Sequence, residues 1–330
     1  MVAGILEYAA LVVFYSLLST VTLESLLRLW HVQDPPFSVV FRLQTLLLPP
    51  VAPLLFGLLN PERGSEPFRR ETALVDLHNW LGQEPSLSHP AWLLLIAAVG
   101  VTAVLLAATE VAGFLRRPRA RQGLQPMSIP LAQRLAAVLD TLVARGLTPV
   151  PTLLLDQPDP AAYTIGLRRP AVVITAGMVE MLDDEELASV LAHEVAHVRR
   201  RHNWLGWLVF CLRLASFYNP VSLVTFHQIG HDIEKVCDRD AAAITGKPLA
   251  LASALIKVYR TSYAVVGEFR WWSRPLARRV AALENRALQT LVMDRVERLV
   301  HSETAREVSS PLLRLGLAVS GVLMLAYLVV

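Results

Sequence analysis

The sequence contains little cysteine and little charge. Its 330 residues include two cysteines, Cys211 and Cys237, so we expect no disulfide framework and two reduced thiols. Charged residues make up 18% and hydrophobic residues 54% of the chain, with a mean hydropathy of +0.44. A soluble globular protein of this length rarely has so apolar a composition. The composition therefore predicts an integral membrane protein, and the net charge of +3 requires no nucleic-acid partner.

Four long apolar runs approach or exceed the ~20 residues that a helix needs to cross the hydrocarbon layer. The first is too long for the core of a signal peptide and lacks a small-residue cleavage site after it, so we expect an uncleaved helix. The second contains Arg42 and three prolines, which predicts a kinked helix. The four runs are 4–30, 37–59, 91–115 and 312–330.

Charge next to the third run predicts the orientation in the membrane. Arginines follow it at positions 116, 117, 119 and 121, and such a cluster is typical of the cytoplasmic side. The N-terminus and the loop 60–90 would then be external. The sequence therefore predicts a three-helix N-terminal transmembrane region over 1–120, a cytoplasmic domain over 121–305 and a C-terminal transmembrane helix over 306–330.

The pentapeptide HEVAH contains His193, Glu194 and His197, and it lies in the segment that we predict to be cytoplasmic. Residues four apart share one face of a helix, so both imidazoles can bind one zinc ion while the glutamate reaches a water on the metal. Asp183 and Glu186 form the pattern of a capping box, which predicts where this helix begins. The alternative is a partly buried helix whose histidines make ordinary hydrogen bonds.

A catalytic zinc needs a third protein ligand and an open position. Glu234 is the best candidate, and Asp238, one turn later, would accept the second N–H of a ligand histidine. The alternatives are a solvated acidic face and a second histidine pair, His227 and His231, which lacks an adjacent glutamate. Cys237 as a fourth ligand would close the open position, and we discount it.

These residues predict peptide-bond hydrolysis with one Zn²⁺ per chain and no covalent intermediate. Zinc lowers the pKa of its water and polarises the substrate carbonyl. Glu194 would take the proton of that water and deliver it to the leaving amine. His231 would help to stabilise the oxyanion, unless it is only part of a helix surface.

The fold class that we predict is a mainly α integral membrane protein, with about four transmembrane helices and an α+β cytoplasmic zinc protease domain that carries a small β-sheet. An apolar stretch over 204–229 turns at Asn219-Pro220 and predicts a hairpin in or on the membrane; an ordinary buried helix pair is the alternative. A helix over 280–299 carries Arg295 among other arginines, which suit either anionic headgroups or solvent. Short strands are expected at 152–155, 163–165 and 171–175.

Four stretches of the sequence carry a family resemblance. They are GLRRP at 166–170 before a strand, LAHEVAHVRR at 191–200, the Asn-Pro turn after an apolar run, and EKVCD at 234–238. Together they resemble the BlaR/MecR-type membrane metallopeptidases, the antibiotic-sensing transducers of bacteria. The resemblance implies that His193, His197 and Glu234 hold zinc, that Glu194 is the base and that Asp238 supports the ligands.

Two features limit this resemblance. Sensors of that family carry an external penicillin-binding domain after the fourth helix, whereas this sequence stops at Val330, so we do not expect sensing by acylation. The residues DEEL at 184–187 and RH at 201–202 are also similar to the HtpX-like and CAAX-prenyl-protease group, which shares the HExxH…ExxxD arrangement. The BlaR/MecR type is favoured by the Asn-Pro turn and by Cys237-Asp238.

The functional hypothesis is a zinc endopeptidase of the inner or plasma membrane that acts on the cytoplasmic side. Its partners would be a protein or peptide substrate and the lipid bilayer. The role would be regulatory cleavage of a repressor or of the chain itself, or clearance of membrane proteins as in HtpX-like proteases. A catalytically idle membrane scaffold or receptor is the alternative from another class. The oligomeric state stays open, with a homodimer as one option.

Overall fold

The computed structural model describes residues 2–31, 34–77, 90–106, 129–267, 289–301 and 310–330. The chain forms two compact units. The first unit comprises residues 1–119, 207–232 and 305–330, and the second comprises 120–206 and 233–304. The arginines at 116–121, on which the predicted orientation depends, lie outside the described residues.

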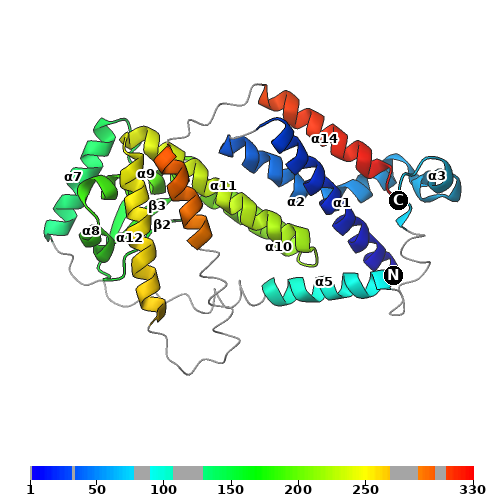
Figure 1. Cartoon of the computed structure of the whole chain (residues 1–330), viewed down its shortest axis with the longest axis horizontal. Coiled ribbons are helices and arrows are strands. Elements are labelled where there is room, and N and C mark those ends of the chain that lie inside the picture. The colour runs from blue at the N-terminus through cyan, green and yellow to red at the C-terminus, as the bar shows by residue number, and fades with distance from the viewer. Residues whose placement is uncertain (1, 32–33, 78–89, 107–128, 268–288, 302–309) are drawn as a thin grey trace. The chain divides into compact units, whose positions relative to one another are not determined.

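Three apolar helices pack together in the first unit. They are α1 (Val2–Leu29), α2 (Pro35–Leu59) and α14 (Pro311–Tyr327), which lie side by side in Figure 1. The stretch Glu7–Leu29 and all of α2 are long and apolar enough to cross a membrane, whereas α14 is shorter. α2 remains one helix through its three prolines. Their buried contacts include Leu23, Leu27, Phe37, Phe41, Ala318 and Val322.

Two short elements lie at the C-terminal end of α14. They are η1 (Pro61–Gly64), whose Arg63 donates to the Tyr327 carbonyl, and α3 (Glu66–Glu71), whose Phe68 ring lies against Tyr327. The described part of the third apolar run is α5 (Pro90–Leu106). Arg63 donates from Nη2 to the Tyr15 hydroxyl at 2.6 Å and to the Ala326 carbonyl at 2.9 Å. Because the last carbonyls of a helix lack partners within it, this arginine caps α14.

The predicted hairpin is a pair of helices, α10 (His202–Ala215) and α11 (Pro220–Thr245), joined through Asn219. The part over 207–232 belongs to the first unit, where the Asn219 side chain donates to Ser16 Oγ at 2.7 Å. Arg42, the charge that weakened the second apolar run, pairs with Glu24 at 2.9 Å and with Asp232 of α11. Partners therefore stabilise this charge among apolar helices.

The second unit contains a small sheet covered by helices. The strands β1 (Thr152–Leu155), β2 (Ala162–Ile165) and β3 (Ala171–Thr175) agree with the sequence prediction. Their order is β1-β3-β2, with β1 parallel and β2 antiparallel to β3. The central strand is rich in β-branched residues, and its Val172, Val173 and Ile174 are buried. β2 is consequently an edge strand.

Helices α7 (Ile129–Ala144), α8 (Ala176–Met181), α9 (Asp184–Arg199) and α12 (Pro248–Gly267) complete this unit, with a further helix over 289–301. α9 contacts the sheet, α7 and α12, and Figure 1 shows α12 beside it. Leu187 and Leu191 of α9 are fully buried in the core that these elements share. The helix that carries HEVAH therefore packs in the core of the second unit.

Candidate metal centre

Helix α9 presents the HEVAH residues on its buried side. Asp183 accepts hydrogen bonds from the backbone of Glu185 and Glu186, and Glu186 accepts one from the backbone of Asp183, which confirms the predicted capping box. His193 and Glu194 are 7% and 9% exposed. The cap determines where the helix starts, and the four-residue spacing then aligns His193 with His197.

Helix α11 supplies the carboxylates. Glu234 and Asp238 are one turn apart, as predicted, and both approach His193. Neighbouring Ile233 and Val236 are buried, and Ala241 and Ile244 of the same helix pack in the core that α9 shares. The two carboxylates therefore face α9 and do not form a solvated acidic face.

Three candidate ligand groups form a triangle of the size that zinc requires. His193 Nε2 lies 3.2 Å from His197 Nε2 and 3.4 Å from Glu234 Oε2, and His197 Nε2 lies 3.5 Å from Glu234 Oε1. Ligands about 2.0–2.1 Å from a tetrahedral zinc are roughly 3.4 Å apart. The donor set of two imidazoles and one carboxylate also suits zinc. The residues present therefore fit the ion that the sequence predicts.

Asp238 and Arg295 contact the residues that form the triangle. His193 Nδ1 lies 3.0 Å from Asp238 Oδ1. Arg295, on the helix over 289–301, donates to both oxygens of Asp238 at 2.7 and 2.6 Å and lies 3.0 Å from Glu234 Oε2. Sequence reasoning assigned Arg295 to headgroups or solvent, and this was wrong, because its side chain is only 13% exposed.

His202 was also missed, although it follows the motif by five residues. Its Nδ1 lies 3.3 Å from His197 Nδ1 and 3.3 Å from Cys237 Sγ. These three residues form a second group whose ligand atoms converge. His197 thus faces Glu234 with one ring nitrogen and His202 with the other. Cys237 is buried beside His202 and is not part of the first triangle.

Burial and charge shift the pKa values of the site in different directions. Burial alone would lower the pKa of His193, but Asp238 and Glu234 outweigh it and raise the pKa to about 10. Burial and the neighbouring His193 lower the pKa of His197 to about 4. Burial opposes ionisation of Glu234, yet His193 holds its pKa well below the usual range. Burial raises the pKa of Glu194. The site thus favours a cation between the two carboxylates.

The second histidine pair of the sequence takes no part in these groups. Among the residues that the structure describes, the converging sets are His193–His197–Glu234 and His197–His202–Cys237. His227 is exposed, and its Nδ1 lies 2.8 Å from the Leu223 carbonyl. His231 lies on α11 three residues before Glu234. Its role in the reaction stays a prediction.

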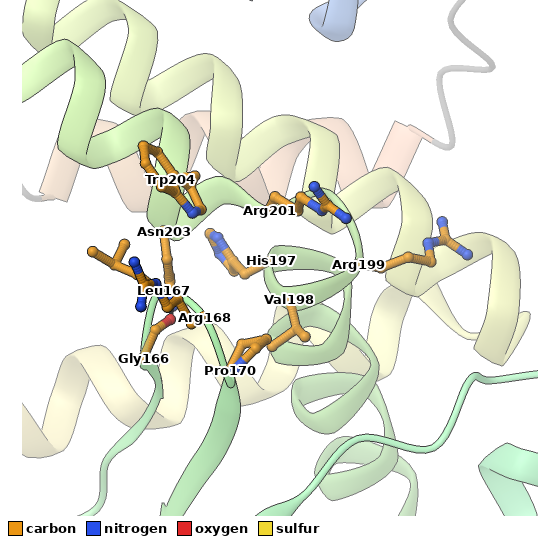
Figure 2. Close-up of a pocket in the computed structure, with 10 residues that line it drawn as sticks. All are labelled: Gly166, Leu167, Arg168, Pro170, His197, Val198, Arg199, Arg201, Asn203 and Trp204. Carbon is orange, nitrogen blue, oxygen red and sulfur yellow. Dashed lines mark hydrogen bonds between the residues drawn. The ribbon is translucent and has the colours of Figure 1, made fainter.

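A pocket of about 370 Å³ opens beside His197. Figure 2 shows His197 between Trp204 and the turn that carries Gly166 and Pro170. The lining comes from the β2–β3 turn, the end of α9 and the start of α10. Its residues are Gly166, Leu167, Arg168, Pro170, His197, Val198, Arg199, Arg201, Asn203 and Trp204.

Comparison with known proteins gives consistent results. The chain is 30% identical to the protease HtpX homolog of Acidiphilium cryptum over 42% of this chain and 60% of that protein. It is 29% identical to the homolog of Salinibacter ruber, over 42% and 61%, and 31% identical to that of Ralstonia nicotianae, over 41% and 59%. The matched region thus spans about three fifths of the relatives' length.

A family model covers a larger part of the chain. The model of the BlaR1 peptidase M56 family matches residues 83–286, which are more than half of the 330 residues. This region contains α9 and α11, which carry the candidate ligands, and the β2–β3 turn. The resemblance that the motifs carried is thereby confirmed: the chain belongs to the BlaR1 peptidase M56 family.

Proposed function

We propose that the chain is an integral-membrane zinc endopeptidase. The observation that carries the proposal is the triangle of His193 Nε2, His197 Nε2 and a Glu234 carboxylate, with sides of 3.2, 3.4 and 3.5 Å. A bound zinc would acidify a water molecule and polarise the scissile carbonyl. Asp238 would orient His193 through Nδ1, as a carboxylate does behind many zinc-bound histidines.

Glu194 is the proton carrier in this proposal. It follows His193 directly, so it projects from α9 next to the two imidazoles. Burial raises the pKa of Glu194 toward neutral pH, and a carboxylate with a higher pKa is a stronger base. Glu194 accepts a proton from the attacking water and returns it to the leaving amine. His231 remains our candidate for a further hydrogen bond to the oxyanion.

The edge strand β2 offers a place for an extended substrate. Because β2 pairs with β3 on one side only, its other edge can bind a peptide strand by backbone hydrogen bonds. β2 also contacts α9. A peptide on this edge would therefore run along the helix that carries the zinc ligands.

The membrane part of the proposal follows the apolar helices. α1 and α2 would span the bilayer, with α5 and α14 as the described parts of two further spans. Exposed apolar side chains on these helices, such as Leu58 and Leu312, would face lipid. The domain over 121–305 would face the cytoplasm, and the hairpin over 204–229 would hold the site near the membrane surface.

The biological substrate has two candidates. Membership in the BlaR1 peptidase family favours regulatory cleavage of a repressor or of the chain itself. Identity of about 30% to HtpX homologs favours clearance of membrane proteins. A purified protein that cleaves many unrelated unfolded substrates would support the second candidate, whereas one defined cleavage site in one partner would support the first.

Substitution of Glu194 tests the proposal. We expect Glu194→Gln to retain one zinc per chain and to lose at least about 10²-fold in peptide cleavage, because only the proton carrier is lost. His197→Ala should lose zinc as well, whereas His301→Ala, at an exposed histidine, should change neither. Metal analysis and a peptide-library assay measure both properties. Wild-type protein without bound zinc, or full cleavage by Glu194→Gln, would contradict the proposal and favour an idle scaffold.

A further inference from the structure

The pocket beside His197 carries positive charge that the described residues neutralise only in part. Three arginines line it, and no aspartate or glutamate does. Arg199 is paired with Asp240 at 2.8 Å. The guanidinium groups of Arg168 and Arg201, in contrast, make no hydrogen bond or ion pair with any residue that the structure describes. Two guanidinium groups thus remain available to an anion.

The backbone that carries these arginines is fixed. Asn203 donates to the Gly166 carbonyl at 2.9 Å and accepts from Thr164 Oγ1 at 2.8 Å, which ties the β2–β3 turn to the start of α10. Gly166 has φ +84°, and a Cβ there would lie 2.5 Å from the Arg169 carbonyl oxygen. Arg201 itself has φ 54°, a strained value for a residue with a side chain. The turn and the helix corner are therefore preorganised.

The pocket lining also includes apolar surface that can contact the aliphatic part of a ligand side chain. Trp204 and Leu167 are 57% and 38% exposed, so apolar surface is open to a ligand. Arginine binds a carboxylate through a planar fork of donors. His197 is both a candidate zinc ligand and part of the pocket lining. A carboxylate bound in the pocket would therefore lie next to the candidate metal site.

We propose that this pocket binds a carboxylate of the peptide substrate, so that Arg168 and Arg201 direct cleavage to sites near an acidic group. The inference rests on the proposed peptidase function and specifies its substrate class. The carboxylate belongs either to an internal aspartate or glutamate or to the C-terminus of the peptide. An anionic lipid headgroup is a rival ligand, but the hollow shape of the site and its contact with a candidate zinc ligand favour a peptide.

Matched peptides test the preference. Full-length, zinc-loaded protein is given peptides that differ only by Glu, Gln or Lys beside the scissile bond, each with a free or an amidated C-terminus. We expect kcat/KM to be on the order of 10-fold to 100-fold higher for a carboxylate than for its amide, as for charge-assisted hydrogen bonds. A difference between the Glu and Gln peptides identifies an internal carboxylate, and a difference between the free and amidated peptides identifies the C-terminal carboxylate.

Charge-reversal variants test the assignment. Arg168→Glu and Arg201→Glu should each lower the Glu:Gln ratio, and the double variant should favour the Lys peptide. Arg169→Glu is the control, because Arg169 is exposed in the same turn and does not line the pocket. Binding of fluorescent peptides to zinc-loaded Glu194→Gln protein, by anisotropy, should follow the same order without requiring turnover.

The outcomes separate this inference from the proposed function. Cleavage without a carboxylate preference, or an equal effect of Arg169→Glu, would overturn the pocket assignment and leave the peptidase intact. Absence of all cleavage would contradict the proposed function. The relative affinities for the Glu, Gln and Lys peptides would still show whether the pocket binds a carboxylate. If Arg168→Glu and Arg201→Glu reduce binding to vesicles that contain phosphatidylglycerol but do not change peptide preference, the pocket binds headgroups and the inference fails.

Discussion

At the scale of single residues, the two candidate ligand histidines are oriented by different neighbours. Asp238 approaches Nδ1 of His193, whereas His202 approaches Nδ1 of His197. Groups of this kind fix the ring and its tautomer, and their loss typically weakens metal binding 10–100-fold. His202 is therefore a positioning residue in our interpretation, although it contacts the first triangle only through His197.

Substitution of His202 tests this role. We expect His202→Ala to weaken zinc binding by about 10-fold or more, because His197 loses the neighbour of its Nδ1. Competition with a chelator of known affinity measures the change. His202→Gln, which keeps a polar group near His197, should recover part of the affinity, and His227→Ala should have no effect. Unchanged affinity in His202→Ala would show that Asp238 alone orients the site.

Arg295 offers a second test at this scale. Its guanidinium donates to both oxygens of the buried Asp238, so Arg295→Ala removes one of the two partners that this carboxylate has among the described residues and leaves only His193. Removal of one partner from a buried pair costs roughly 3–5 kcal/mol of unfolding free energy. Chemical denaturation of the full chain in detergent measures it. Arg298→Ala is the matched control, since that exposed pair with Asp294 should contribute about 1 kcal/mol or less.

At the scale of elements, Glu186 connects two helices. It completes the cap of α9, and it accepts from Ser253 Oγ at 2.6 Å and from Lys257 Nζ at 2.5 Å, both on α12. Burial opposes its ionisation, but Lys257 and Ser253 lower its pKa below the usual value of 4.5. One buried carboxylate thus contributes both to the cap of α9 and to the contact of α9 with α12.

The lowered pKa predicts how stability depends on pH. Between the pKa of folded Glu186 and 4.5 the unfolded chain binds more protons, so this contribution to stability is complete above 4.5 and is lost as the pH falls. At pH 7 we expect Glu186→Gln to cost about 1–3 kcal/mol. The difference from wild type in thermal midpoint should shrink below pH 4.5. Glu180→Gln, at an exposed position of α8, should show neither effect.

At the scale of the whole molecule, the orientation in the membrane can be tested by labelling. In a Cys211→Ser background, a membrane-impermeant maleimide should label Glu71→Cys in intact cells and Asp140→Cys only after permeabilisation. Both positions are exposed, and in the sequence Glu71 precedes the third apolar run whereas Asp140 follows it. Labelling of Asp140→Cys alone in intact cells would reverse the orientation that the arginines at 116–121 predict.

The sequence predicted much of the architecture because its strongest signals are local. The capping box at Asp183 and Glu186, the three short strands and the apolar runs follow from periodicity within one element. The HEVAH spacing likewise aligns His193 and His197 within one helix. The family could be inferred because its motifs are short and contiguous.

Only the tertiary structure decided which distant residues support the site. Nothing in the local pattern around position 295 indicates that its guanidinium contacts Asp238, fifty-seven residues earlier. The same holds for His202 beside Cys237 and for Arg168 and Arg201, which line one pocket. Helix periodicity fixes neighbours three or four residues apart, whereas packing between elements fixes the others, and only the fold specifies that packing.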